Sequence, residues 1–416
     1  MPLAPETATV TVPSRPPTVQ DFARIGGLEA LCRGCTLSVF PLVMYRALGS
    51  AQLVSQIYFA IGVVSLLTAL TVPALTRRFT RRQIYLFATA LYVVAALAGM
   101  VGGLWVNAAL LCAVMAAAMS FVCFNAYVLD HIDKADFGKL ETLRLFYGGA
   151  GWVVGPALGV WLLSVWSGAP FLLLACAATV MGVLIWRTPL GEGAFQATAA
   201  VAAGRAPRRA HPLAIVQRFF AQPRMVTGWL IPAVRSCAWW LYFVYVGIFA
   251  VENGLGDQVG GVASSIANLG LFLAPLMLRW MRSRSVRIAI RVGCLGGSVC
   301  FFVATLAAPW PWMTVAALIA GTVFLVLLDT SAGLPFLMAV KPSERTEMSA
   351  VYSSFRDVSG IVSPGIAWLV LQFFPIVGVF ALGGALLLGA WWVAGQIHPE
   401  LGTPATLRSR RRGGPS

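Results

Sequence analysis

Six ionisable residues stand out within long apolar stretches of this 416-residue chain: Glu29, Arg33, Arg235, Asp329, Arg356 and Asp357. A charged side chain at the centre of a bilayer costs about 2.5–3.5 kcal/mol on insertion scales, so such residues pair or line a polar cavity. A guanidinium binds a carboxylate or phosphate through two parallel hydrogen bonds, and a desolvated carboxylate can exchange a proton near neutral pH. The six residues therefore point to binding of an anion and carriage of a proton.

Glu29 and Arg33 are four residues apart with the acid first, the order that favours an ion pair within a helix. Two roles are open for Arg33. It can neutralise Glu29, or it can face a central cavity together with Arg235. Guanidinium groups on two sides of such a cavity would favour an anionic substrate.

Asp329 also has two possible roles, as a proton carrier or as a fixed counter-ion of Arg235. Arg356 and Asp357 are adjacent, so their side chains point about 100° apart on a helix and cannot pair simply with each other. For these two we expect a structural ion pair with a neighbouring element, or a gating role.

The elements that must position these charges are membrane helices. The chain is 59% hydrophobic and 11% charged, whereas soluble chains carry about 25% charged residues. Continuous apolar runs of roughly 20 residues predict membrane helices and exclude an alternating β-barrel. We expect an all-α membrane protein with twelve transmembrane helices in two pseudo-symmetric six-helix bundles. The predicted segments are 23–47, 52–76, 83–103, 107–130, 142–165, 168–187, 225–251, 258–278, 286–308, 311–340, 348–374 and 375–396.

The net charge of +15 follows from topology and does not indicate nucleic-acid binding. Basic residues cluster in the connections after even-numbered segments, whereas the opposite loops contain only Arg46. The positive-inside rule then predicts that both termini are cytoplasmic. Arginine far outnumbers lysine, which suggests a GC-rich bacterial genome and the inner membrane. Contact with membrane lipids and a monomeric state are expected.

The sequence shows no enzyme motif. It contains neither a G-x-x-x-x-G-K-[ST] loop nor an H-E-x-x-H pair, so catalysis and ATP-driven transport are not expected. Cys32-x-x-Cys35 lies within an apolar segment without a second cysteine pair or a nearby histidine. We interpret these cysteines as small packing residues, and we expect no metal and no cofactor.

The two halves of the chain repeat each other. Arg33-Gly34-Cys35 has a counterpart 202 residues later in Arg235-Ser236-Cys237, and the segment 73–82 has one at 275–284. A parallel duplication of this kind is typical of secondary transporters, whose binding sites lie at the repeat interface near the bilayer midplane.

A third repeated feature is a face of small residues. Gly151, Gly155 and Gly159 are four residues apart and flank Pro156, and Pro364 marks a similar stretch 208 residues later. Glycines at this spacing let another helix approach closely. We expect this face at the interface between the two halves.

These features resemble the Major Facilitator Superfamily over nearly the whole chain. Gly151-x-x-x-Gly155-Pro156-x-x-Gly159 resembles the helix 5 signature of its exporters and antiporters. The family's loop motif, roughly G-x-L-x-D-R-x-G-R-R, is matched in part by residues 73–82. Arg78, Arg81 and Arg82 match the basic positions of the motif, but Arg77 occupies the position where the motif has an acid. The helix 4 arginine of many proton-coupled exporters is missing, because residues 107–125 carry no charge.

The resemblance implies a twelve-helix fold with alternating access, a cavity lined by helices 1, 4, 7 and 10, and gating by the basic loop. Five parts are predicted: a disordered tail (1–22), two helical bundles (23–187 and 225–397), a linker (188–224) and a basic tail (398–416). We expect a secondary transporter of a small organic solute, anionic and proton-coupled, with export favoured. A multidrug/proton antiporter and a non-transporting receptor or assembly factor remain alternatives.

Overall fold

The structure is a computed structural model that describes residues 18–76, 78–131, 137–188, 212–340 and 345–398. The N-terminal half contains six helices: α1 (Val19–Leu48), α2 (Ala51–Leu75), α3 (Arg81–Val101), α4 (Trp105–His131), α5 (Phe137–Val165) and α6 (Ala169–Arg187). A short helix, α8 (Pro212–Phe220), precedes the C-terminal half.

The C-terminal half repeats this arrangement with several broken helices. Its elements are α9 (Pro223–Glu252), α10 (Gln258–Leu269), η1 (Gly270–Leu273), α11 (Ala274–Arg282), α12 (Val286–Leu306), α13 (Pro311–Ser331), α14 (Leu334–Ala339), α15 (Arg345–Ser353), α16 (Phe355–Val370) and α17 (Val377–Ala394). Within the described ranges, eleven helical stretches are long and apolar enough to cross a membrane. The 16-residue α16 falls below that length and continues α15. The all-α prediction is confirmed.

Local sequence explains where two predicted boundaries are wrong. The helix α1 begins at Val19, inside the predicted 1–22 tail, because Thr18 and Asp21 form a capping box that satisfies free backbone N–H groups. The predicted 188–224 linker contains α8, whose Phe219 is buried against Phe336 of α14 with ring centroids 6.2 Å apart. The rest of the linker, residues 189–211, lies outside the described residues.

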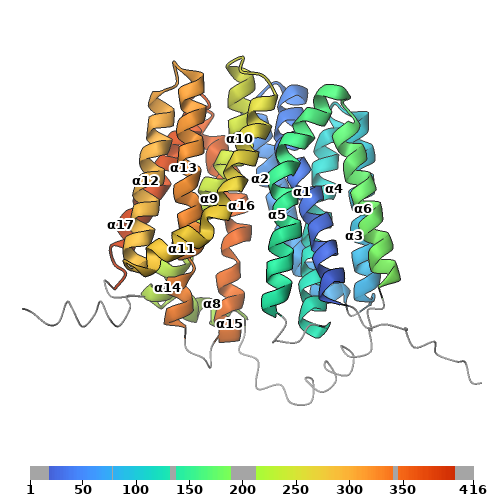
Figure 1. Ribbon diagram of the computed structural model, residues 1–416, viewed down its shortest axis with the longest axis horizontal. Helices are drawn as coiled ribbons and strands as arrows, with labels where there is room; N and C mark the ends of the chain where they lie inside the picture. The colour runs from blue at the N-terminus through green and yellow to red at the C-terminus, as the bar shows by residue number, and fades with distance from the viewer. Residues whose placement is uncertain (1–17, 77, 132–136, 189–211, 341–344, 399–416) are drawn as a thin grey trace, which may run out of the picture.

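The two halves stand side by side (Figure 1), and they meet at one end of the bundle. The hydroxyls of Ser55 and Tyr245 lie 2.6 Å apart, and Arg46 forms an ion pair with Asp257. These residues lie where α1 and α9 end and where α2 and α10 begin. Toward the other end the ribbons of the two halves diverge (Figure 1), and Phe146 of α5 is 72% exposed.

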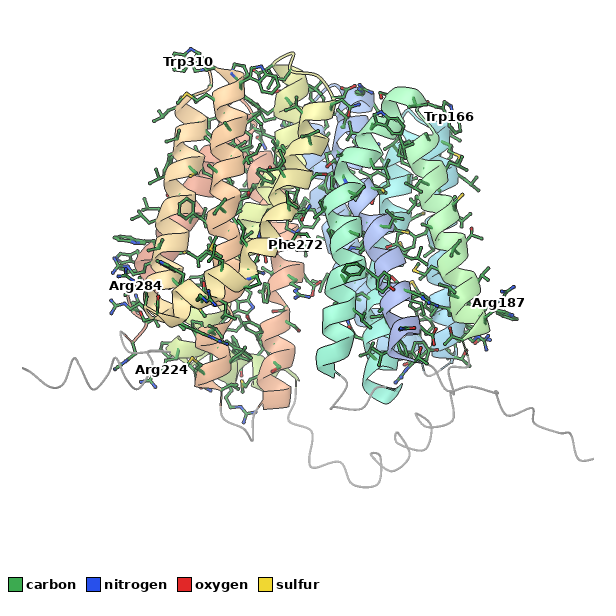
Figure 2. The ribbon with its side chains drawn as sticks, in the orientation of Figure 1. Trp166, Arg187, Arg224, Phe272, Arg284 and Trp310 are labelled. Atoms are coloured by element: carbon green, nitrogen blue, oxygen red, sulfur yellow. The ribbon has the colours of Figure 1, made fainter. Side chains whose placement is uncertain are left out.

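The molecule is also polarised along its length. Figure 2 shows Trp166 and Trp310 at one end of the bundle and Arg187, Arg224 and Arg284 toward the other. The Arg46–Asp257 and Ser55–Tyr245 contacts between the halves lie at the tryptophan end, and Gly62 of α2 meets Gly360 of α16 nearer the middle of the bundle.

The small-residue face of α5 packs closely, but against a different partner from the one predicted. A Cβ on Gly155 would lie 2.7 Å from the backbone carbon of Gly34 in α1, and one on Gly151 would lie 2.7 Å from the backbone nitrogen of Leu31. The face therefore contacts α1 of its own half, and its predicted position between the halves is wrong. Instead, Pro156 meets the other half, because its carbonyl lies 2.8 Å from a Cβ built on Gly261 of α10.

Candidate substrate site

Arg235 and Asp329 form an ion pair inside the C-terminal half. Nη1 of Arg235, on α9, lies 2.9 Å from Oδ1 of Asp329 on α13. Trp239 donates its indole N–H to the other carboxylate oxygen over 3.2 Å, and Arg235 donates to the hydroxyl of Ser236. Trp239 can share Asp329 because it lies one turn after Arg235 on the same face of α9. Of the two predicted roles, Asp329 has the geometry of a counter-ion.

A third arginine joins this pair from α16. The guanidinium carbons of Arg235 and Arg356 lie 5.5 Å and 5.8 Å from the centroid of the same ring, that of Phe355. The two cations therefore cannot be farther apart than the sum of these distances. Arg356 also interacts electrostatically with Arg33 of the opposite half.

The sequence interpretation of Arg356 and Asp357 as structural ion-pair residues differs from the structure. Both side chains are exposed, and among the described residues neither takes part in a salt bridge. Arg356 lies one helical turn before Gly360, whose carbonyl oxygen lies 2.8 Å from a Cβ built on Gly62 of α2 in the other half. The sequence carries no signal for this placement, because only the packing of α16 against α2 shows which of its faces lies toward the other half.

Arg33 occupies the opposing wall, on α1. Its side chain is exposed, and its guanidinium carbon lies 5.5 Å from the ring centroid of Trp152 in α5. Glu29, one turn earlier on α1, is 7% exposed and accepts a hydrogen bond from Ser120 of α4 over 3.4 Å. Glu29 is therefore buried inside the N-terminal bundle, whereas the side chain of Arg33 is exposed.

The basic motif after α2 packs within its own half. Arg77 lies outside the described residues, and Arg78 is exposed. The guanidinium carbons of Arg81 and Arg82 lie 6.0 Å from the ring of Tyr127 and 4.9 Å from the ring of Trp186. Its predicted gating role stays a prediction.

Pro364 is buried in α16. Its neighbour Ser363 is also buried and donates its hydroxyl to the carbonyl of Ser359, one turn earlier in α16. Cys32 and Cys35 are buried free thiols within α1, in agreement with the packing role given to them.

The site thus combines three guanidinium groups, from three helices and both halves, with the paired carboxylate of Asp329. Each guanidinium lies beside an aromatic ring, an arrangement that holds the cation while leaving edge N–H groups free to bind an oxyanion. Two repeated helical halves with charged groups between them are the arrangement typical of secondary transporters.

Comparison with protein-family models identifies the family. The model of the Major Facilitator Superfamily matches residues 25–364, and the chain belongs to this family. A relative in Deinococcus radiodurans, named "Putative sugar efflux transporter", is 27% identical over 61% of this chain. The match spans 63% of that relative's length.

Solved structures show the same fold. The nucleoside transporter NupG aligns over 91% of this chain and 99% of its own, with a TM-score of 0.69 and 12% identity. A POT family transporter in complex with 5-aminolevulinic acid aligns over 92% of this chain and 96% of its own, with a TM-score of 0.70 and 12% identity.

Proposed function

We propose that this transporter carries a small organic anion together with a proton, by alternating access, and that export is its direction. The observation that carries the anion assignment is the excess of positive charge at the site. Arg235 is paired there with Asp329, whereas Arg33 and Arg356 are exposed and form no salt bridge with another described residue. Carboxylates and phosphates satisfy guanidinium groups bidentately.

The ion pair supports a link between substrate and proton. A proton on Asp329 removes the counter-ion of Arg235 and frees that guanidinium for the substrate. Proton and anion then favour each other's binding, and this coupling is reciprocal. Both are therefore carried in the same direction, and export follows the outward gradient of the substrate.

The proposed orientation places the arginine-rich end of the bundle in the cytoplasm of a bacterial cell. The positive-inside rule supports it, because Arg187, Arg224 and Arg284 lie toward that end. The site then opens to the cytoplasm, which suits loading of a substrate for export. The name of the Deinococcus relative supports the same direction.

A thermal-shift screen of the purified protein tests the anion assignment. The panel contains organic acids, phosphate monoesters and neutral sugars, and a ligand that binds the folded state raises its apparent stability. We expect an acid or phosphate ester to stabilise the wild type, with roughly 10- to 100-fold weaker binding in Arg33→Gln and Arg356→Gln. Arg284→Gln, at an exposed helix boundary, is the matched control. Stabilisation by anions that is the same in all three variants contradicts the proposal.

Export of a neutral sugar is a second candidate, favoured by the name of the Deinococcus relative. Aromatic rings near the site suit a sugar: Trp239 and Phe243 stack at 5.1 Å with an interplanar angle of 11°. The same thermal-shift screen distinguishes anion export from sugar export. A neutral sugar that stabilises wild type and Arg356→Gln equally favours sugar export.

A further inference from the structure

A second candidate binding site lies on the N-terminal half, away from the substrate site. It is a groove of about 600 Å³ between α3 and α6, the helices at the edge of the bundle remote from the C-terminal half (Figure 1). Its lining includes Ala90, Val93, Ala178, Gly182, Trp186 and Arg187. The small side chains of Ala90, Ala178 and Gly182 leave space between the two helices.

The interior of the groove offers a ligand no free hydroxyl donor. Thr89 donates to the carbonyl of Leu86, and Thr179 donates to that of Ala175, so both lining threonines are satisfied by their own helices. The surrounding surface is apolar and exposed, with Val180 49% exposed. An apolar chain fits this lining better than a polar solute.

One end of the groove is basic. Arg187 ends α6 and is exposed (Figure 2). Trp186 beside it is 65% exposed, and the guanidinium of Arg82 lies 4.9 Å from its ring centroid. Nε of Arg82 is buried and has no hydrogen-bond partner in the described part of the chain. Two guanidinium groups and an indole ring at a helix end match the headgroup level of a bilayer.

The length of the groove matches one leaflet. From Ala178 to Arg187 the helix rises about 14 Å at 1.5 Å per residue. Half of the ~30 Å hydrocarbon core is about 15 Å. A ligand with its acid at Arg187 would therefore extend its chain to the middle of the membrane, where the lining ends.

We propose that the α3–α6 groove binds an anionic phospholipid of the adjacent leaflet, with its phosphate at Arg82 and Arg187 and one acyl chain between the helices. Basic pockets between membrane helices bind acidic headgroups, and each basic residue near the surface adds about fivefold to that affinity. The site is separate from the substrate site, so the proposal is independent of what is transported.

Native mass spectrometry of the full-length protein tests this proposal, with phosphatidylglycerol and phosphatidylcholine as probes. We expect one phosphatidylglycerol to be retained in preference to phosphatidylcholine, and binding to weaken roughly 30-fold in the double variant Arg82→Gln/Arg187→Gln. The control Arg282→Gln/Arg284→Gln removes two exposed charges at the end of α11. Equal loss in both double variants would mean a general surface charge effect and would overturn the site.

Two further measurements separate the groove from its basic end. Ala90→Trp fills the exposed rim of the groove and keeps both arginines, and it should also displace phosphatidylglycerol. Glycerol 3-phosphate supplies the headgroup without chains and should fail to compete. If Ala90→Trp binds normally, or if glycerol 3-phosphate competes as well as the lipid does, the acyl chain does not occupy the groove.

Discussion

Nη1 of Arg235 lies 2.9 Å from Oδ1 of Asp329, and this ion pair joins α9 to α13 at the candidate substrate site. The side chains are 17% and 24% exposed, so water screens them only in part. Removing one partner of such a pair leaves an uncompensated charge, whereas removing both does not.

Asp329→Asn should therefore lower the free energy of unfolding by roughly 2–3 kcal/mol. Arg235→Gln/Asp329→Asn should be more stable than either single variant. Thermal unfolding in detergent measures both effects. A double variant as unstable as the sum of the singles would show that the two residues act independently.

The same pair predicts how substrate and proton are coupled. In proteoliposomes loaded with the anion found by the screen, efflux should acidify the external medium for the wild type. In Asp329→Asn the carboxyl group can no longer bind or release a proton, so efflux should continue without acidification. A pH-sensitive dye outside the vesicles measures this difference. Alkalinisation during wild-type efflux would contradict transport in the same direction.

Arg46 and Asp257 form an ion pair between the two halves, at the end of the bundle where α1 and α9 end. The side chains are 46% and 33% exposed, and exposed ion pairs contribute up to about 1 kcal/mol. Arg46→Gln should increase opening at this end by up to about fivefold, seen as faster hydrogen exchange in residues 51–61 and 258–265. Arg284→Gln, which makes the same charge change elsewhere, should leave these peptides unchanged. Unaltered exchange in Arg46→Gln would mean that the hydrogen-bonded and packed contacts hold this end without the ion pair.

The contact of α5 with α1 predicts a sharp difference between two glycines. Gly155→Ala places a Cβ 2.7 Å from the backbone of Gly34, which forces the helices apart and should destabilise the protein by about 1–3 kcal/mol. Gly389→Ala is the control, because no atom lies within 4 Å of its Cβ, and alanine favours a helix. Thermal unfolding of the two variants is the measurement. Equal stability would show that α1 and α5 can separate without cost.

Phe355 lies beside two of the three guanidinium groups. Phe355→Leu should weaken anion binding roughly two- to fivefold, since a partly exposed cation–π contact contributes about 0.5–1 kcal/mol. Phe373→Leu changes a 79% exposed ring beyond the other end of α16 and should leave binding unchanged. Titration of the stabilising ligand by thermal shift compares them. Equal affinity in both variants would show that the ring of Phe355 does not contribute to anion binding.

Much of the fold follows from the sequence, because a membrane helix is recognised from its own residues. Hydropathy located every membrane-spanning segment, with ends displaced by caps and breaks such as Thr18 and Ser354. The duplication places Arg33 and Arg235 in equivalent helices. An ion pair between Asp329 and Arg235 is one of the two roles that the sequence offers for Asp329. These inferences rest on composition, spacing and repetition.

Which face of a helix meets which neighbour was decided by tertiary structure. The glycines of α5 require a close partner wherever they lie, but only the packing of the bundle selects α1. Arg356 was assigned to a structural ion pair, although it lies on the wall between the halves. Glu29 is buried and accepts a hydrogen bond from Ser120 of α4, whereas Arg33, one turn later on α1, is exposed. Periodicity fixes the directions of side chains within a helix, whereas their partners depend on the rotation and packing of every helix around it.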